Sequence, residues 1–469
     1  MDPAMLEARG FRGEVVRAGD ARYDELRKAF NAMFDRRPAV IARCRDTRDA
    51  AAAVLFARDH GLRLSVYGGG HSIPGHSVCD DGLMIDLRPM KEVEVDPDAR
   101  VCRAGAGLTW AELDAATQGH GLAVTGGRMS TTGIGGFTLG GGSGWIERKC
   151  GYAADNLIGA ELVTAEGEIV TASSRDNPQL FWGLRGGGGN FGVVTRFDFR
   201  LHPIGPVVLG GLLMYPAPMA ADVLRNFRDV MADAPDEVGS GVALITAPRE
   251  DFIPEPVRGR PIVGVLVCYA GRVADGEEAL RPLREFGPPA MDTVGAMPYT
   301  AVQKLLDPTL PDGMRHYMTS DFLAALTDEA IELLCRHHLS MPSPLSQIVV
   351  LPGGGVLGGV PEGATAFRQR RAPFNYLVDA QWANPTGDEE SIAWAKEVAA
   401  SMKPFSAGSA YLNFIGDEGE DRIVAAFGAS AYARLQALKN RYDPENVFRL
   451  NQNIEPSATF RREAAGARS

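Results

Sequence analysis

Glycine is concentrated in three clusters, and these constrain the fold of this chain more than any other feature. The first, residues 67–72, has the sequence YGGGHS and follows a predicted strand at 62–66. The second, 126–144, is GGRMSTTGIGGFTLGGGSG, and the third, 185–192, is RGGGGNFG. Because glycine lacks a Cβ, such loops bend sharply and let a ligand approach the backbone closely. Three clusters predict a ligand with several parts.

The second cluster combines glycine with Ser and Thr hydroxyls, which exposes many hydrogen-bond donors. This pattern favours a pyrophosphate-binding nest built from loop backbone rather than from a helix terminus. The alternative is a pair of tight turns in a β-rich domain. Neither a Rossmann turn nor a P-loop fits, since the first glycines lie between strands and no GxxxxGK[ST] occurs.

The residues before position 205 predict a β-α-β opening followed by a β-rich segment. A helix is expected at 46–60 with Asp46 as its cap, and another opens at a capping box from Thr109 to Glu112. Expected strands lie at 38–43, 62–66, 83–87, 92–95, 100–104, 160–164, 168–171 and 193–201.

After residue 206 the glycines thin out, and strands alternate with amphipathic helices. This alternation of strands and helices predicts an α+β domain in which helices cover one side of an antiparallel sheet. Expected strands lie at 207–214, 241–246, 261–269, 347–351 and 374–381, and expected helices at 219–233, 275–286, 327–339 and 387–402. The tail is expected to hold a short strand, YLNF at 411–414, and a helix near 430–441.

Composition excludes several classes of function. The net charge of −11 over 469 residues argues against a nucleic-acid partner. No apolar run reaches the roughly 18 residues of a membrane span, and the N-terminus lacks the plan of a signal peptide, so we expect a cytoplasmic protein without a membrane partner. No zinc or other metal site is expected, since no cysteine forms a CxxC or lies at ligand spacing from histidine; the cysteines are Cys44, Cys79, Cys102, Cys150, Cys268 and Cys335.

Seven motifs together resemble the FAD-linked oxidases of the vanillyl-alcohol-oxidase and berberine-bridge-enzyme superfamily. They are YGGGHS (67–72), GLMIDL (82–87), GIGGFTLGGGSGW (133–145), GYAADN (151–156), FWGLRGGGGNFGVVT (181–195), YLNF (411–414) and YDPENVFRLNQNI (442–454). The resemblance implies an α+β fold with a PCMH-type FAD-binding domain of two α+β subdomains at 1–205, core 37–203. It also implies a substrate domain at 206–404 and a tail, 405–469, that completes the FAD domain.

By the same resemblance, His71 is the residue bonded covalently to the 8α carbon of the flavin. The alternative is a hydrogen-bonding histidine beside a non-covalent flavin. Many relatives form a second bond through a cysteine, but Met129 stands at that position and offers no thiolate. We therefore expect one covalent link, as in the hydroxynicotine-oxidase branch. Tyr67 replaces an arginine that is frequent in relatives.

The cofactor-binding residues implied by the resemblance come from the glycine clusters, the GYAADN motif and the tail. Besides His71, Met129 and Tyr67 they are Gly68, Gly69, Gly70, Ser72, Gly75, Gly126, Gly127, Thr131, Thr132, Gly133, Gly135, Gly136, Gly140, Gly141, Gly142, Asp155, Asn156, Gly192, Val193, Val194, Tyr411 and Asn413.

The chemistry implied is hydride transfer from a CH–OH or CH–N carbon of a small metabolite to flavin N5, with reoxidation by O2 to H2O2. Tyr411 is the first candidate for the base, followed by Asn413, although a core aromatic is the alternative for Tyr411. Gln347 and Tyr376 are weaker candidates, and the strand 347–351 offers no carboxylate.

Two other functions stay open: a dehydrogenase with a non-oxygen acceptor, and a non-catalytic flavin-binding protein. We expect the partners to be a small-molecule substrate and O2, and the protein to be a monomer or homodimer. Peroxide production separates an oxidase from a dehydrogenase. Sequence alone does not identify the substrate.

Overall fold

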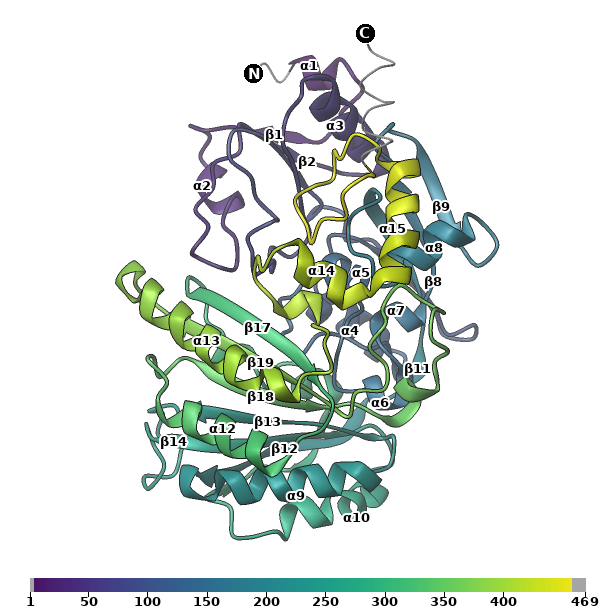
Figure 1. Cartoon of the computed structure of the whole chain (residues 1–469). Coiled ribbons are helices and arrows are strands. Elements are labelled where there is room, and N and C mark those ends of the chain that lie inside the picture. The colour runs from purple at the N-terminus through teal and green to yellow at the C-terminus, as the bar shows by residue number, and fades with distance from the viewer. Residues whose placement is uncertain (1–3, 458–469) are drawn as a thin grey trace.

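The computed structural model describes residues 4–457, and its first subdomain is a small sheet backed by a helix (Figure 1). The strand order is β1-β2-β4-β3, with β2, β4 and β3 parallel. Asp46 caps α3 by accepting from the backbone N–H of Arg48 and Asp49, as the sequence predicts. The YGGGHS segment follows the end of β3. The elements are α1 (Ala4–Glu7), β1 (Glu14–Val16), α2 (Tyr23–Leu26), β2 (Val40–Arg43), α3 (Thr47–Asp59), β3 (Leu64–Tyr67) and β4 (Leu83–Asp86).

The second subdomain is a five-stranded antiparallel sheet of order β5-β6-β10-β8-β9. The expected capping box is present, since Thr109 and Glu112 bond each other's backbone at the start of α4. The elements are β5 (Val93–Asp96), β6 (Val101–Gly105), α4 (Trp110–Gln118), β7 (Leu122–Ala123), α5 (Ile134–Leu139), α6 (Glu147–Cys150), α7 (Ala153–Asn156), β8 (Leu157–Val163), β9 (Ile169–Ser173), α8 (Pro178–Leu184), β10 (Val193–Arg200) and β11 (His202–Pro203).

The second glycine cluster departs from the sequence prediction in one respect. The sequence favours a nest of loop backbone at 126–144, and the structure contains the helix α5 within this segment. Ile134 and Leu139 are buried at its two ends, and this anchoring offsets the low helix propensity of the two glycines between them.

The middle of the chain forms one large antiparallel sheet with the order β15-β12-β14-β13-β18-β19-β17, while β16 pairs with β12. Four helices, α9, α10, α12 and α13, cover one face (Figure 1), as predicted. The strands are β12 (Val207–Pro216), β13 (Val238–Thr246), β14 (Pro261–Tyr269), β15 (Met291–Asp292), β16 (Gly295–Pro298), β17 (Arg315–Leu323), β18 (Gln347–Pro352) and β19 (Phe374–Trp382); the helices are α9 (Ala220–Asp233), α10 (Val273–Arg284), α11 (Tyr299–Val302), α12 (Asp328–Leu339) and α13 (Asp388–Met402).

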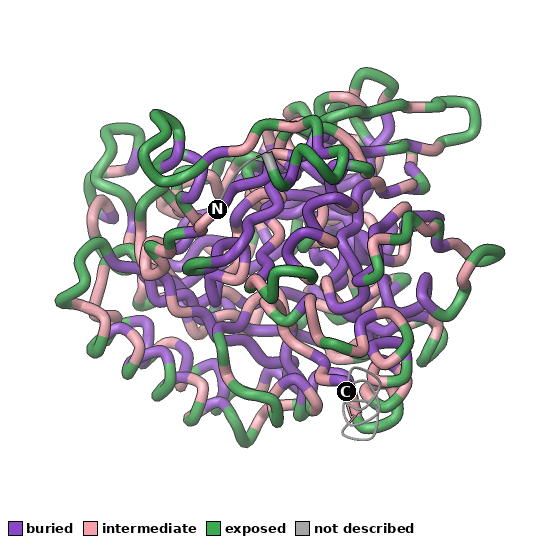
Figure 2. The backbone as a smooth tube through the Cα atoms, turned by 90° about the horizontal axis from the view of Figure 1, so that it is seen from above, coloured by how far each residue is buried: buried purple, intermediate pink, exposed green. Residues whose placement is uncertain are grey.

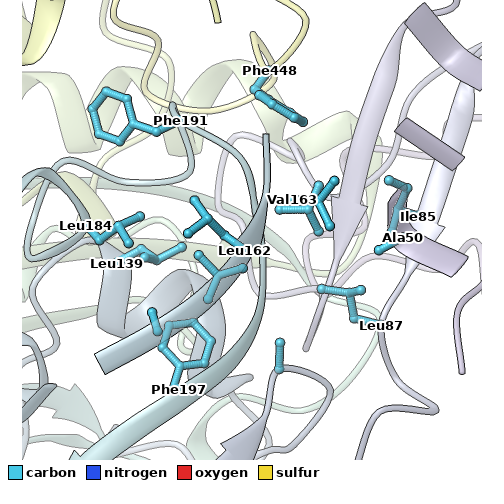
Figure 3. Close-up of a cluster of buried hydrophobic side chains, with 14 of the residues drawn as sticks. Ala50, Ile85, Leu87, Leu139, Leu162, Val163, Leu184, Phe191, Phe197 and Phe448 are labelled. Atoms are coloured by element: carbon cyan, nitrogen blue, oxygen red, sulfur yellow. The ribbon is translucent and has the colours of Figure 1, made fainter. Parts of the chain in front are cut away.

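The tail returns to the first half of the molecule. Phe448 lies in one core cluster with Ile85 of the first subdomain and Phe197 of the second (Figure 3). The fully buried Lys439 donates to the carbonyl oxygens of Asn190 and Phe448 and pairs with Asp443 at 2.7 Å. The tail helices are η6 (Leu412–Phe414), α14 (Glu420–Phe427) and α15 (Ala429–Tyr442).

The expected strand at 411–414 is wrong, because these residues form a turn of 3₁₀ helix. Asn413 and Phe414 line a cavity there, and no neighbouring strand pairs with them along residues 4–457. Exposed segments lie around the periphery of the molecule, while the backbone in the interior is mostly buried (Figure 2).

Candidate active site

A cavity of about 400 Å³ lies where all three glycine clusters, the tail and the free face of the large sheet meet. Its volume is in the range of small-molecule and cofactor sites. One wall is mainly glycine backbone. The opposite wall is formed by side chains of β17, β18 and β19.

The glycine wall contains two kinds of glycine. At Gly69 and Gly133 a Cβ would overlap the backbone of the other residue, so the first two clusters pack main chain against main chain. At Gly136 and Gly189 a Cβ would meet no protein atom within 4 Å, and neither has a positive φ. Both line the cavity. The missing side chains at these two positions therefore leave room for a ligand rather than for the protein.

His71 lies at the junction of the first two clusters and faces the cavity. Its Nε2 is 2.9 Å from Thr131 Oγ1, and its Nδ1 is 3.3 Å from Thr132 Oγ1. Its ring stacks on Phe30 at a centroid distance of 4.3 Å. Burial, helped by the neighbouring His316, lowers the pKa of His71 to about 4. The imidazole is thus neutral at pH 7 and keeps a nucleophilic ring nitrogen.

Polar atoms at the cavity wall lack protein partners. Ser77 Oγ, His76 Nδ1 and Asn451 Oδ1 are buried, and none is hydrogen-bonded within residues 4–457. Buried polar atoms without partners are rare in folded proteins, so these indicate a polar ligand. Together with the open glycines, they fit the ribityl, phosphate and adenine parts of an FAD.

The sheet wall contains a carboxylate that the sequence did not indicate. Asp379 of β19 is fully buried and accepts a hydrogen bond from Gln347 Nε2 at 3.2 Å. His316 Nδ1 lies 3.0 Å from its other oxygen, and His316 Nε2 has no partner among the described residues. The ring of His316 stacks on the far side of Phe30 at 4.6 Å. Phe30 thus joins the Asp379 group to His71.

Tyr376 does not face the cavity, and its assignment as a substrate-facing residue is wrong. Side chains alternate along a strand, so Tyr376 and Val378 point into the helix-covered core while Leu377 and Asp379 line the cavity. The expectation of no carboxylate held for β18 itself but not for β19 beside it. Across the ladder Asp379 is paired with Gln347 and with Met318.

Tyr411 lies behind the glycine wall. Its hydroxyl oxygen accepts hydrogen bonds from the backbone N–H of Gly142 and Ser143 and from Asn413 Nδ2. Burial raises its pKa to about 12, so it is a poor proton acceptor at neutral pH. The structure therefore favours the core-aromatic alternative for Tyr411.

Asp155 and Asn156 were expected to bind the cofactor, but both stabilise the protein instead. Asp155 accepts from Arg370 Nη2 at 2.7 Å and from the backbone N–H of Tyr152. Asn156 is buried and lies 2.6 Å from His202. Neither lines the cavity.

The remaining expectations divide into two groups. Expected residues that line the cavity are Gly68, Gly69, Gly70, His71, Ser72, Gly127, Met129, Thr132, Gly133, Gly135, Gly136, Gly140, Gly192, Val193, Val194, Gln347 and Asn413. Those that do not are Tyr67, Gly75, Gly126, Thr131, Gly141 and Gly142. Tyr67 instead donates to the backbone carbonyl of Lys28.

Sequence reasoning missed several cavity residues. Of the third cluster only Gly192 was assigned to the cofactor, and the four glycines at 186–189 were noted without being assigned, so a signal for them was present. The side chains of the sheet wall carried no such signal. The missed residues are Phe30, His76, Ser77, Gly186, Gly187, Gly188, Gly189, Met318, Leu377, Asp379, Asn451 and Gln452.

Comparison with known proteins agrees with this geometry. The family described as FAD binding domain matches residues 38–173, and the family described as berberine and berberine like matches 410–455. An FAD-linked oxidoreductase of Dictyostelium discoideum is 31% identical, covering 95% of both chains. The (R)-6-hydroxynicotine oxidase of Paenarthrobacter nicotinovorans is 30% identical, covering 96% of this chain and 98% of its own.

This chain belongs to the berberine-bridge-enzyme-like family of FAD-linked oxidoreductases. The solved structure of 6-hydroxy-D-nicotine oxidase from Arthrobacter nicotinovorans superposes with a TM-score of 0.86 at 28% identity, covering 95% of this chain and 98% of that one. A chitooligosaccharide oxidase shares the fold with a TM-score of 0.82 at 24% identity, covering 97% and 99%.

Two further findings concern membrane-spanning helices and metal-binding clusters. No helix within residues 4–457 combines the length and apolar character needed to cross a membrane. The same residues contain no cluster of three or more His, Cys, Asp or Glu side chains arranged to hold a metal ion.

Proposed function

We propose that this protein is an FAD-dependent oxidase that removes hydride from a CH–OH or CH–N carbon of a small organic molecule. The observation that carries the proposal is the cavity, in which a wall of open glycines and orphaned polar atoms faces a wall that ends in Asp379. When bound, FAD supplies the hydride acceptor and passes electrons to O2, giving H2O2. The protein binds and orients the cofactor and the substrate, and it accepts the proton that the substrate loses.

His71 is the residue we assign to the covalent link. Its neutral ring faces the cavity and is held between Phe30 and the hydroxyls of Thr131 and Thr132. A single link is supported by Met129, which lines the cavity, and by the position of the six cysteines, none of which does.

Asp379 is the residue we assign as proton acceptor from the substrate hydroxyl or ammonium. A carboxylate accepts but does not donate, so it orients Gln347 with its amide N–H toward Asp379. His316 holds the other oxygen. Gln347 and His316 thus each contact one oxygen of Asp379 and hold the carboxylate at the cavity wall. General-base catalysis needs an acceptor that is positioned in this way.

Anaerobic mixing of the purified holoenzyme with a panel of alcohols and amines tests the proposal. We expect at least one class to bleach the flavin absorbance and, in air, to yield one H2O2 per oxidised substrate. Bleaching without peroxide in air would favour the dehydrogenase. A flavin that no compound bleaches would contradict catalysis and favour a flavin-binding protein.

A further inference from the structure

The substrate end of the cavity has a chemical character that narrows the substrate class. It lies on β17, β18 and β19, where Met318, Asp379 and Gln347 form one cross-strand row. Val349 and Leu377 form the next row along the same face. These five side chains include only two polar groups, and the two are bonded to each other.

Apolar side chains from three other segments close this end. Leu310 comes from the segment after α11, Phe414 from the tail and Phe30 from the N-terminal segment. The segment after α11 is fixed to the second glycine cluster, because Asp307 accepts from the backbone N–H of Ser130 at 2.8 Å and from its hydroxyl at 2.6 Å. The apolar cover is therefore part of the assembled site.

The substrate end has one acidic side chain and no basic side chain of the lysine or arginine type beside it. Among the described residues that line the cavity, only Asp379 and Arg128 belong to the Asp, Glu, Lys and Arg types. The guanidinium group of Arg128 already has partners within the protein. It donates hydrogen bonds to Ser143 Oγ and Gly144 O and lies over the ring of Trp145. Nothing near Asp379 is a lysine or arginine within ion-pair distance in residues 4–457. An anionic ligand would meet repulsion without a compensating cation.

The hydrogen-bond polarity of Gln347 is fixed by Asp379. Because the carboxylate only accepts, the amide nitrogen points to it, and the amide oxygen is turned away from it. Gln347 lines the cavity, so that oxygen is placed to accept a hydrogen bond from a ligand. His316 keeps Asp379 in position from the other side.

From these observations we infer that the substrate is a predominantly apolar molecule whose hydroxyl or protonated amine donates a hydrogen bond to Gln347 on binding, before the proton passes to Asp379 in the reaction. This inference rests on the proposed function and narrows it. Oligosaccharides are disfavoured, because Met318, Val349 and Leu377 offer no hydrogen-bond partner to the hydroxyl groups of a sugar, and a buried hydroxyl without a partner is destabilising. Carboxylates and phosphates are excluded by Asp379. The site thus differs in chemistry from that required by an oligosaccharide oxidase of the same fold.

Isothermal calorimetry on the oxidised, anaerobic holoenzyme tests the inference independently of turnover. The probes share one ring: cyclohexylmethanol, cyclohexylmethylamine, the methyl ether of the alcohol, and cyclohexanecarboxylate, with cellobiose as the sugar. We expect the alcohol or the amine to bind about tenfold more tightly than the ether. The carboxylate and cellobiose should not bind measurably.

Gln347→Leu should remove the preference for the donor-bearing probe over the ether. Ile348→Val, on the same strand but on the opposite face that packs into the helix-covered core, is the matched control and should retain it. Asp379→Asn distinguishes the two donors, because loss of the charge should weaken the amine about tenfold and the alcohol less than threefold.

Equal binding of the ether and the donors, or binding of cellobiose or the carboxylate, would overturn the inference, as would failure of both donors to bind. These outcomes are separate from failure of the proposed function. A holoenzyme that is reduced by cellobiose and yields H2O2 in air would remain an oxidase while contradicting the substrate class.

Discussion

The two walls of the cavity are built on different physical principles. The glycine wall contacts a ligand through backbone and through space that side chains leave open, as at Gly136 and Gly189. The sheet wall contacts a ligand through side chains such as Asp379 and Gln347, whose roles depend on strand pairing. A backbone site needs specific residues at fixed spacing. A side-chain site needs only that the right residues meet in space.

Replacement of Gly69 by Val should have the largest effect of these changes, because it should destabilise the fold itself. The new side chain would overlap the backbone of Gly133 and separate the first two clusters. We expect a loss of more than about 4 kcal/mol in the free energy of unfolding, measured by denaturant titration. Gly358→Val, at a site where a Cβ meets nothing within 4 Å, is the control. A stable Gly69→Val protein would contradict the close packing of the two clusters.

Replacement of Gly136 by Leu should separate folding from cofactor binding. There is room for the side chain in the protein, but it would project into the cavity. We expect far-UV circular dichroism close to that of the parent and flavin content below about one tenth of it. Gly295→Leu, also without neighbours within 4 Å but in β16, should keep its flavin. Full flavin occupancy in Gly136→Leu would place the cofactor elsewhere.

Asp379→Asn should affect only the sheet wall, and thus the reaction with substrate rather than the binding of flavin. Flavin content and the covalent link should be unchanged, because no glycine cluster contacts this residue. We expect the rate of anaerobic flavin reduction to fall about 100-fold, the low end of general-base effects. Stopped-flow absorbance measures it. An unchanged rate would show that substrate loses its proton without Asp379.

Asp114→Asn should have the smallest effect, at the contact between the two halves. Burial raises the pKa of Asp114 to about 7, while Gln303 of the segment after α11 donates to it. Between about pH 4 and 7 the folded state holds a proton that the unfolded state has lost, so this residue's contribution to stability declines as pH rises through that window.

We therefore expect Asp114→Asn to be more stable than the parent at pH 8 by at least about 1.4 kcal/mol, the equivalent of one pKa unit, with the difference vanishing near pH 4. Thermal unfolding at both pH values measures this. A variant that is destabilised equally at both would show that the carboxylate is ionised and needed in the native state.

The contrast between the glycine wall and the sheet wall also explains which parts of the site could be predicted from the sequence. The clusters around Gly69, Gly133 and His71 could be located because the glycines themselves carry the signal. His316 could not, since β17 has the polar sequence RHYMTSDFL and was not predicted as a strand. Asp379 lay within the predicted strand 374–381, but nothing in the sequence showed which face of that strand lines the cavity. Without β17, nothing indicated that His316 would lie beside Asp379.

The fold was predictable to a similar degree. Capped helices such as α3 and α4 and the helix-covered sheet followed from local patterns. The tail helix expected near 430–441 is also present as α15. The 411–414 segment did not follow, because Asn413 is placed by contact with Phe137 O and Tyr411 rather than by strand pairing. Tyr376 was misassigned because its register on β19, one residue from Leu377, decides which face it occupies.

The central claim is that His71 holds a flavin against the glycine wall. Peptide mass spectrometry of the denatured, protease-digested holoenzyme tests it most directly. We predict the mass of FAD on the peptide that contains His71, on no other peptide, and absent from His71→Ala. A flavin released on denaturation, or attached to another peptide, would contradict the account.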